Sequence, residues 1–397
     1  MLERCVAPSW VKYALAKLPF SQIQFGSLTL SYHDENVRFD GPHPGPHAEL
    51  ILNQPLRALW LIKTQGELGF VQAYHEGALD TTSLYHLLTL AHLNEAVLAP
   101  MLANKIGALR HLWQHRKRHN SLTNSQRNIS YHYDLGNDFY ALWLDSSMTY
   151  SSALFESDNA RLSEAQAAKN QRILQQLDLK GGERLLEIGC GWGGFMQQTL
   201  EQKENLQIKG LTLSTEQRSY ALQRLQGFAP ERYEVAFQDY RLEQAQYDHI
   251  VSIEMFEAVG KEYWQSYFET LKQSLKAQGK VVLQIITIDE AKAETYQSSV
   301  DFIQAYIFPG GLLPSCAQLE SLAQAHGFVI QNQLDFGPDY AKTCQLWKQR
   351  FNQQSDRLNE MGYDTHFQRI WNYYLDYCTV GFESGQISVK QLTLVHQ

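Results

Sequence analysis

The sequence of 397 residues contains no apolar run that approaches the ~20 residues needed to cross a bilayer. Its first twenty residues also lack the long apolar core and the cleavage site of a signal peptide. The five cysteines are scattered without CxxC or metal-ligand spacing, which argues against zinc and favours a reducing compartment. A net charge of −8 excludes a general attraction to nucleic acid. We therefore expect a cytoplasmic protein with no metal site and no nucleic-acid partner.

The chain is long enough for two domains, and its N-terminal part differs in pattern from the rest. Residues 25–32 alternate apolar and polar side chains, as a half-buried strand does. A Pro/Gly-rich turn region follows at 40–50, and 58–74 is interpreted as an extended or mixed segment. These features predict a small α+β domain over 1–108. Residues 109–130 are basic and polar and are interpreted as a linker.

The remainder of the chain, residues 131–397, is expected to form one α/β domain. From about residue 165, predicted strands alternate with predicted helices, which is typical of a doubly wound, mostly parallel sheet. An insertion near 290–320 interrupts this alternation. A last strand region near 328–348 and a helical tail are predicted to end the chain.

A glycine-rich loop with the sequence Glu187-Ile-Gly189-Cys-Gly191-Trp-Gly-Gly follows the first buried strand of this domain. Glycines there let a ligand approach the backbone, and the next helix presents its N-terminus. A dinucleotide site is the obvious rival interpretation. However, the spacing is GxGxGG rather than GxGxxG. The second predicted strand also ends without the Asp or Glu that usually holds the ribose, and it offers Thr212 and, one turn later, Gln217 instead.

Acidic side chains follow the next two predicted strands. Gln238 and Asp239 occupy the position that lies beside an adenine ring in such sheets, although Asp239 could equally be a surface acid. Glu254 and Glu257 end the following strand at the carboxyl edge, where ligands bind. The alternative role of these two acids is to cap the helix that follows.

Taken together, these segments resemble the cyclopropane-fatty-acyl-phospholipid synthase family, which includes the mycolic acid cyclopropane synthases. The matching segments run from about 130 to 350 and are YHYDLGNDFY, MTYSSALF, EAQAAK, LLEIGCGWGG, GLTLSTEQ, FQDYR, DHIVSIEMFEAVG, YIFPGGLLPS and DFGPDYAKT. The resemblance implies a class I methyltransferase fold with a seven-stranded sheet, and S-adenosylmethionine as cofactor. By matching position, the resemblance implies that the cofactor contacts Tyr150, Ser151, Gly189, Gly191, Thr212, Gln217, Gln238 and Asp239. We also expect Glu187 to contact the cofactor, because it lies near the carboxyl end of the strand that leads into the glycine loop.

The reaction implied by the resemblance begins with attack of an alkene on the sulfonium methyl group, which leaves a cation on an acyl chain. Family members use a bound bicarbonate as base, held by Cys, Glu, His and Tyr. Glu257 and Tyr340 match this set, whereas Ser152 and Gln284 stand at the Cys and His positions. Glutamine cannot titrate near neutral pH but can still donate to an anion, so bicarbonate remains an expectation. A methyl branch is the alternative to a cyclopropane product.

The resemblance therefore implies a C-methyltransferase acting on unsaturated acyl chains of phospholipids, with YIFPGG forming part of an acyl channel. The N-terminal domain resembles the small lipid-associated domain of longer bacterial members. We expect peripheral contact with the inner face of the membrane, and the family suggests a homodimer. Two other functions compete with this one. They are N-methylation of a small amine, and lipid binding without catalysis after loss of the site.

Overall fold

The computed structural model describes residues 19–102 and 135–397. Contacts divide the chain into two compact units. The first contains Met1–Gln114, Val300–Phe302 and Ser355–Val380, and the second contains the rest. The predicted linker at 109–130 lies outside the described residues. Within the described ranges, no helix has the length and apolarity that a membrane span requires.

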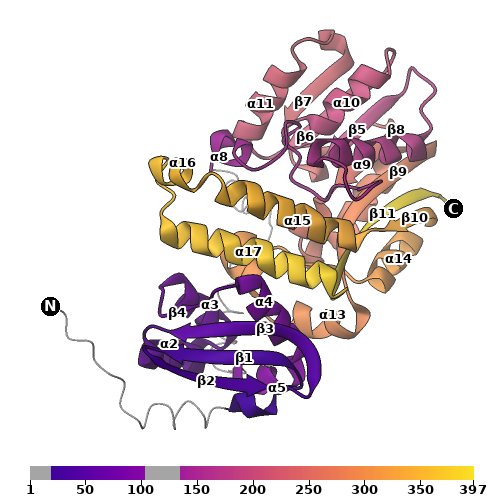
Figure 1. Cartoon of the computed structure of the whole chain (residues 1–397). Coiled ribbons are helices and arrows are strands. Elements are labelled where there is room, and N and C mark those ends of the chain that lie inside the picture. Colours follow the sequence, from indigo (N-terminus) through magenta and orange to yellow (C-terminus); the bar gives the residue numbers. More distant parts are fainter. Residues whose placement is uncertain (1–18, 103–134) are drawn as a thin grey trace. The chain divides into compact units, whose positions relative to one another are not determined.

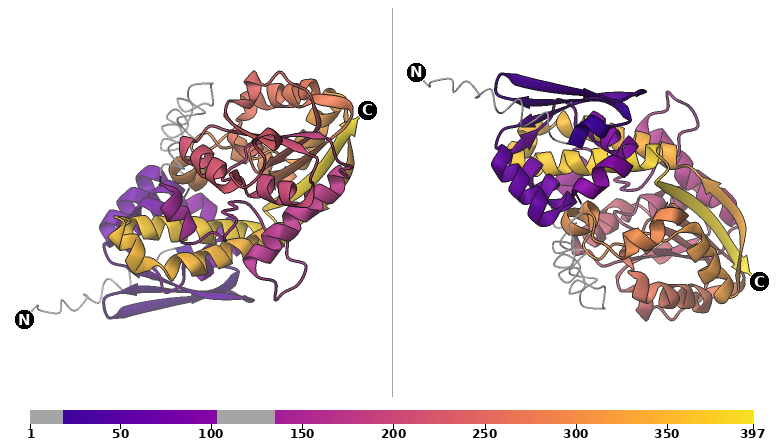
Figure 2. Two further views of the ribbon diagram at one scale, coloured as in Figure 1. Left: turned by 90° about the horizontal axis from the view of Figure 1, so that it is seen from above. Right: turned by 90° about the horizontal axis from the view of Figure 1, so that it is seen from below.

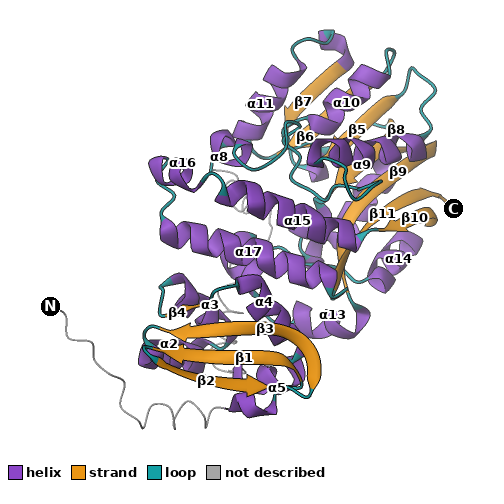
Figure 3. Cartoon of the chain, in the orientation of Figure 1, coloured by secondary structure: helices purple, strands orange, loops and turns teal. Residues whose placement is uncertain are grey.

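A four-stranded sheet in the order β2-β1-β3-β4 forms the base of the first unit (Figure 3). Its strands are β1 (Phe25–Tyr32), β2 (Glu35–Asp40), β3 (His43–Leu52) and β4 (Leu79–Asp80). The strand predicted over 25–32 is confirmed as β1, in which Leu28 and Leu30 are buried together with the neighbouring Ser27 and Ser31. Helices α2 (Pro55–Gln65) and α3 (Glu67–His75) connect β3 to β4. Helices α4 (Leu84–Leu93) and α5 (Glu95–Leu102) follow β4.

Two local predictions in this unit were wrong. The segment 58–74 is helical rather than extended, because Pro55 starts α2 and Gly66, at φ 66°, separates it from α3. The Pro/Gly-rich region at 40–50 is largely strand β3 rather than a turn. Prolines are tolerated there because β4 pairs only with Ile51 and Leu52, so the proline half of β3 has a single neighbouring strand.

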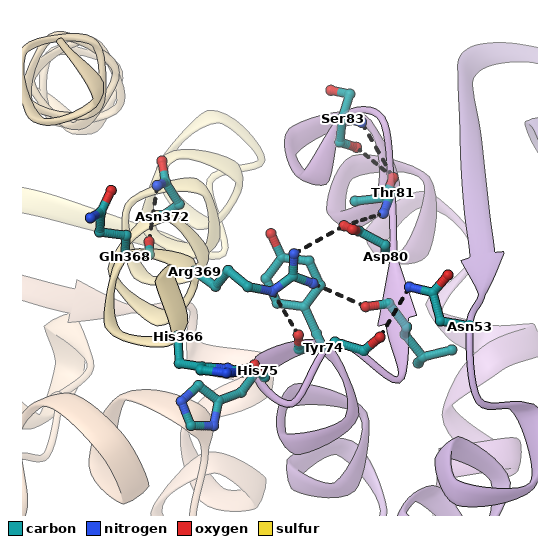
Figure 4. A network of polar contacts seen from close by, with 12 residues as sticks. Asn53, Tyr74, His75, Asp80, Thr81, Ser83, His366, Gln368, Arg369 and Asn372 are labelled. Atoms are coloured by element: carbon teal, nitrogen blue, oxygen red, sulfur yellow. Dashed lines mark hydrogen bonds and ion pairs between the residues drawn. The ribbon is translucent and has the colours of Figure 1, made fainter. Parts of the chain in front are cut away.

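The long helix α17 (Thr365–Glu383) belongs to the first unit through Val380. Arg369 of α17 donates to the carbonyl oxygens of Tyr74 and Leu79 at 2.9 and 3.0 Å. Its guanidinium also pairs with Asp80 at 3.2 Å (Figure 4). Tyr373 also packs against Tyr74 with ring centroids 5.9 Å apart. The prediction of one domain from 131 to the C-terminus therefore differs from the structure here, because α17 buries its aromatic face against N-terminal residues.

A seven-stranded sheet in the order β10-β11-β9-β8-β5-β6-β7 forms the centre of the second unit (Figure 1). All its neighbouring pairs are parallel except those made by β11. The strands are β5 (Arg184–Ile188), β6 (Gln207–Thr212), β7 (Tyr233–Phe237), β8 (Tyr247–Ile253), β9 (Leu275–Ile288), β10 (Phe328–Asp335) and β11 (Ile387–His396). This arrangement confirms the predicted doubly wound fold.

Helices cover both faces of this sheet, because successive strand residues point to opposite sides. Leu185 belongs to the core under one face and Leu186 to the core under the other. The first core is closed by α9 (Leu162–Leu177), α10 (Gly194–Gln202) and α11 (Thr215–Leu225). The second core is closed by α12 (Trp264–Ser274) and α14 (Cys316–Ala325).

The C-terminal segment corrects the expectation of a helical tail. After α15 (Gly337–Asn352), α16 (Ser355–Glu360) and α17, the chain returns to the sheet as β11. Figure 2 shows this last strand in yellow beside orange strands, and its register places Gln391 opposite Gln284 of β9. Residues 290–320 do form an insertion, which contains α13 (Glu290–Gln297) and a π-helical turn at Ile303–Ile307.

Candidate active site

A cavity opens at the carboxyl ends of β5, β6 and β8, and its wall includes the glycine loop. Gly189 has φ 83°, and a side chain there would meet Met255 at 2.8 Å. Gly191 has φ 51°, and an added Cβ would meet nothing within 4 Å. The loop therefore leaves open space beside its backbone that any larger residue would fill. Predicted cofactor contacts on the cavity wall are Tyr150, Ser151, Glu187, Gly189, Gly191, Thr212, Gln217 and Gln238.

Two buried ionisable residues on the cavity wall suit a ligand with polar ends. Glu187 Oε2 is buried and has no hydrogen-bond partner among the described residues. Burial raises the pKa of Glu187 to about 8, and the nearby Lys169 ammonium opposes that shift. Lys169 is fully buried and donates to Ser151 Oγ at 3.0 Å. Burial lowers its pKa to about 8.

The second and third strands place polar side chains beside the same cavity. Thr212 Oγ1 donates to Gln217 Oε1 at 2.9 Å, which fixes both side chains at the end of β6. Gln238 Nε2 donates to Glu243 Oε2 at 3.0 Å. Asp239 is placed differently, because its carboxylate pairs with the Arg241 guanidinium at 2.7 Å. Asp239 also accepts from the Arg241 backbone N–H. Its carboxylate therefore already has charged and backbone donors inside the protein.

The centre of the proposed catalytic group is Glu254, which lines the cavity just after β8. Tyr340 donates its hydroxyl to Glu254 Oε2 at 2.6 Å. Gln284 Nε2 and the Ser152 backbone N–H donate to Oε1 at 2.7 and 2.9 Å. Three of the four residues predicted to hold an anion are thus brought together by the structure, and the anion that they bind is a side-chain carboxylate of the protein.

The protonation of Glu254 is set by opposing effects. Burial is the largest effect and raises the pKa of Glu254 above its usual value, although the donors Tyr340, Gln284 and Ser152 and the charge of Lys169 oppose that shift. Its backbone has φ 51°, a conformation that residues other than glycine rarely adopt. The Glu254 N–H donates to the Gln284 carbonyl at 2.8 Å, so main chain and side chain both hold this conformation.

Glu257 lies apart from this group of donors. Its Oε1 accepts from the backbone N–H of Ile286, and its Oε2 is buried without a hydrogen-bond partner among the described residues. Burial, and next the charge of Glu254, raise the pKa of Glu257 to about 8. A carboxyl group with that pKa is mainly protonated at pH 7. The two acids therefore differ in their contacts, and Glu254 is the one that accepts from Tyr340, Gln284 and Ser152.

The bicarbonate expectation does not fit these contacts. Tyr340 and Gln284 direct their donors to Glu254, and the Ser152 hydroxyl donates to the Ala153 carbonyl at 2.9 Å rather than toward the cavity. A second anion would have to compete for these donors with a carboxyl group that already accepts their hydrogen bonds. The sequence placed both acids at the end of the strand, but Glu257 and not Glu254 was predicted to be one of the four residues that hold the anion. The positive φ of Glu254, which turns its side chain, leaves no signal in a single sequence.

Aromatic side chains pack around Tyr150, which lines the same cavity as Glu254. The Tyr150 ring lies 5.3 Å from the rings of both Trp143 and Trp347. The segment matching the acyl channel lies nearby, because Phe308 is 6.3 Å from Tyr150 and the Leu312 N–H donates to the Glu257 carbonyl at 2.8 Å. An aromatic wall of this kind excludes water and can stabilise a cation.

The sheet order and the glycine loop at the end of β5 define a class I methyltransferase. A family model described as mycolic acid cyclopropane synthetase matches residues 120–392. The chain is 35% identical over 358 residues to the tuberculostearic acid methyltransferase of Mycobacterium tuberculosis, which covers 88% of this chain and 83% of that enzyme. It is 37% identical over 262 residues to the cyclopropane-fatty-acyl-phospholipid synthase of Escherichia coli, covering 66% of this chain and 65% of that enzyme.

Among solved structures, mycolic acid cyclopropane synthase CmaA1 complexed with SAH and CTAB superposes with a TM-score of 0.63 at 33% identity. That match covers 68% of this chain and 97% of the other. The chain belongs to the mycolic acid cyclopropane synthetase family, and it is a methyltransferase that depends on S-adenosylmethionine. The family and the cofactor expected from the sequence are thereby confirmed.

Proposed function

We propose that the protein methylates the double bond of unsaturated fatty acyl chains carried by phospholipids, giving a cyclopropane or a methyl-branched chain. The observation that carries this proposal is the Glu254 carboxylate, which lines the cofactor cavity and is held by Tyr340, Gln284 and Ser152. Carbon methylation of an alkene requires a base beside the methyl donor. The names of the two relatives, which specify a fatty acid and a fatty-acyl-phospholipid, support this substrate class.

S-adenosylmethionine supplies an electrophilic methyl group when it is bound. The cofactor would be received by the open space at Gly191, the buried ammonium of Lys169 and the Glu187 oxygen that has no partner among the described residues. Tyr150 and its aromatic neighbours would shield the cationic acyl chain from water. Glu254 would accept the proton that the cation must lose. Proton loss from the new methyl group before any hydride shift closes a ring. After a shift, proton loss along the chain leaves a methyl-branched alkene, and proton loss from the methyl group leaves an exocyclic methylene branch.

Contact with a lipid surface is part of the same proposal. Helix α2 exposes Leu56, Leu59 and Trp60, with 82%, 47% and 54% of their surfaces accessible. These residues share one face because they are spaced by three and four positions. Apolar and tryptophan side chains on such a face suit the boundary between headgroups and acyl chains. We extend the proposal to peripheral attachment at the cytoplasmic face of the membrane and to a homodimer.

The test uses S-adenosylmethionine with a fully deuterated methyl group and vesicles of monounsaturated phospholipid. Acyl esters are then analysed by mass spectrometry before and after mild hydrogenation. Two retained deuteriums in a product that resists hydrogenation identify a ring, and two in a product that takes up hydrogen identify an exocyclic methylene. Three retained deuteriums identify a methyl branch with its proton lost along the chain. Absence of label in any lipid, with turnover of soluble amines instead, would overturn the proposal in favour of N-methylation.

A further inference from the structure

A continuous line of hydrogen bonds connects the face of α9 to Glu254. Arg172 Nη1 donates to Gln391 Oε1 at 2.7 Å, Gln391 Nε2 donates to Gln284 Oε1 at 3.0 Å, and Gln284 Nε2 donates to Glu254 Oε1 at 2.7 Å. Gln391 and Gln284 are paired in register on β11 and β9. They are 0% and 1% exposed, so water cannot replace these contacts.

The two ends of this line fix its direction. A guanidinium can only donate hydrogen bonds, and an ionised carboxylate can only accept them. A glutamine amide has both a donor NH2 group and an acceptor oxygen. When its neighbours are also amides, the two orientations that exchange the NH2 group and the oxygen therefore have similar energies. Between Arg172 and Glu254, however, both amides must turn their oxygen toward the arginine and their N–H toward the glutamate. Arg172 is itself anchored, because its Nη2 donates to Asn332 Oδ1 at 2.6 Å.

We propose that Arg172 and Gln391 are positioning residues that lock the Gln284 amide with its N–H toward Glu254, and thereby keep Glu254 a proton acceptor. Neither residue is among the described residues that line the cofactor cavity, although Gln391 Nε2 also donates to the carbonyl oxygen of Lys169 on its wall at 3.4 Å. The inference rests on the proposed function, in which Glu254 takes the proton from the substrate. It goes further because it assigns control of Glu254 to two residues that lie beyond its direct hydrogen-bond partners.

The alternative orientation of Gln284 would present its oxygen to Glu254. An acceptor facing a carboxylate repels the ionised form but receives a hydrogen bond from the protonated form. Glu254 would then hold its proton to higher pH. The other charged or titratable groups that act on Glu254 are Lys169 from α9, Tyr340 from α15, and Glu257 from the following turn. The contact of Gln391 with Lys169 is to the backbone carbonyl oxygen and not to the ammonium group.

The experiment substitutes Gln391→Met, which preserves volume and adds no charge but removes the donor to Gln284. The matched control is Thr393→Val on the same strand and the same face. Thr393 is also buried, and its hydroxyl donates to Gln176 at 3.3 Å rather than to this line. Methyl transfer to vesicles of monounsaturated phospholipid is measured from pH 5 to 8 with saturating S-adenosylmethionine.

We expect the acidic limb of the kcat profile to move up by about 0.5–1 pH unit in Gln391→Met, giving activity about three- to tenfold lower on the acid side and converging with wild type above it. KM for S-adenosylmethionine should change less than about twofold. Thr393→Val should retain the wild-type limb. A profile of Gln391→Met that is lowered equally at all pH values, with an unmoved limb, would show a merely structural role and overturn the proposal.

A second pair of variants acts at the other end of the line and covers a failure of Gln391→Met to fold. Arg172→Met should move the limb in the same direction, whereas Arg172→Lys, which still donates, should restore it at least in part. Infrared difference spectra of the protonated carboxyl band, assigned by its loss in Glu254→Gln, give the titration of Glu254 without turnover. An unmoved band in both Gln391→Met and Arg172→Met overturns the inference. An inactive wild type in which the band still moves would instead refute only the proposed function.

Discussion

Replacing Glu254 by Gln removes the charge of the proposed base with little change in shape. The amide oxygen can still accept from Gln284 and from the Ser152 N–H, which both bind Oε1 in the structure. The new NH2 group would face Tyr340, whose hydroxyl can accept as well as donate. All three partners therefore remain satisfied, and we expect the melting temperature to stay within about 3 °C of wild type.

Turnover should respond very differently from stability. Positioned bases contribute about 10²–10⁴-fold, so formation of the wild-type lipid product should fall at least about 100-fold in Glu254→Gln. Binding of S-adenosylmethionine, measured by calorimetry, should change less than about threefold.

The comparison variant is Glu257→Gln. Because the pKa of Glu257 is raised to about 8, an amide there replaces a group that is already neutral at pH 7. Its turnover at pH 7 should fall less than about tenfold. The reverse ranking, with Glu257→Gln inactive and Glu254→Gln near wild type, would refute the assignment of the base to Glu254.

Four further outcomes are expected. Gly191→Val should weaken S-adenosylmethionine binding by more than about tenfold in calorimetry, because the side chain enters the cavity, whereas Gly227→Val, at an exposed glycine, should not; equal affinities would place the cofactor elsewhere. Glu257 binds a proton more tightly in the folded state than unfolded, so the stability of wild type relative to Glu257→Gln should decline by up to about 1.4 kcal/mol per pH unit between pH 6 and 8; denaturant titrations with no such decline would mean that this carboxyl is ionised throughout. Trp60→Ala should reduce sedimentation with phospholipid vesicles about fivefold, and Val329→Ala, at another exposed apolar residue, should not; equal losses would remove α2 from the lipid contact. Activity should be the same in carbon-dioxide-free buffer and with about 10 mM bicarbonate, since the base is part of the chain; stimulation by bicarbonate would contradict the Glu254 assignment.

Much of the fold could be predicted because each element carried a local pattern. The alternation in 25–32 and the glycine loop after Ile188 have direct physical causes in strand geometry and backbone approach. The helices α2 and α3 were missed because each contains only a short apolar run, at 58–62 and at 68–71, and such short runs do not distinguish helix from strand.

Long-range features were beyond the reach of local patterns. Strand β11 pairs with β9, about a hundred residues earlier, and only that pairing shows why Ile387–His396 is extended. Helix α17 has a strongly amphipathic sequence, which predicts a buried face but not the partner of that face. In each case the missing information was the identity of a distant partner.

The candidate site shows the same limit at the scale of single side chains. Tyr340, Gln284 and Ser152 were placed around an anion by resemblance, and the structure brings these three residues together. The sequence could not show which of two acids three positions apart turns toward them. That choice depends on the φ of 51° at Glu254, which follows from contacts made across the sheet.

The strained backbone of Glu254 is explained by how Gln284 holds it. The Gln284 carbonyl accepts from the Glu254 N–H at 2.8 Å, while its side-chain amide donates to the Glu254 carboxylate at 2.7 Å. A residue other than glycine in this conformation costs roughly 1–3 kcal/mol, and it persists only where its surroundings leave no alternative. Because Gln284 of β9 binds both the backbone and the side chain of Glu254, the Glu254 backbone cannot leave this conformation without breaking two hydrogen bonds. The strain therefore fixes the position of the base relative to the cofactor cavity, which a diffusible anion could not achieve without a dedicated set of free donors.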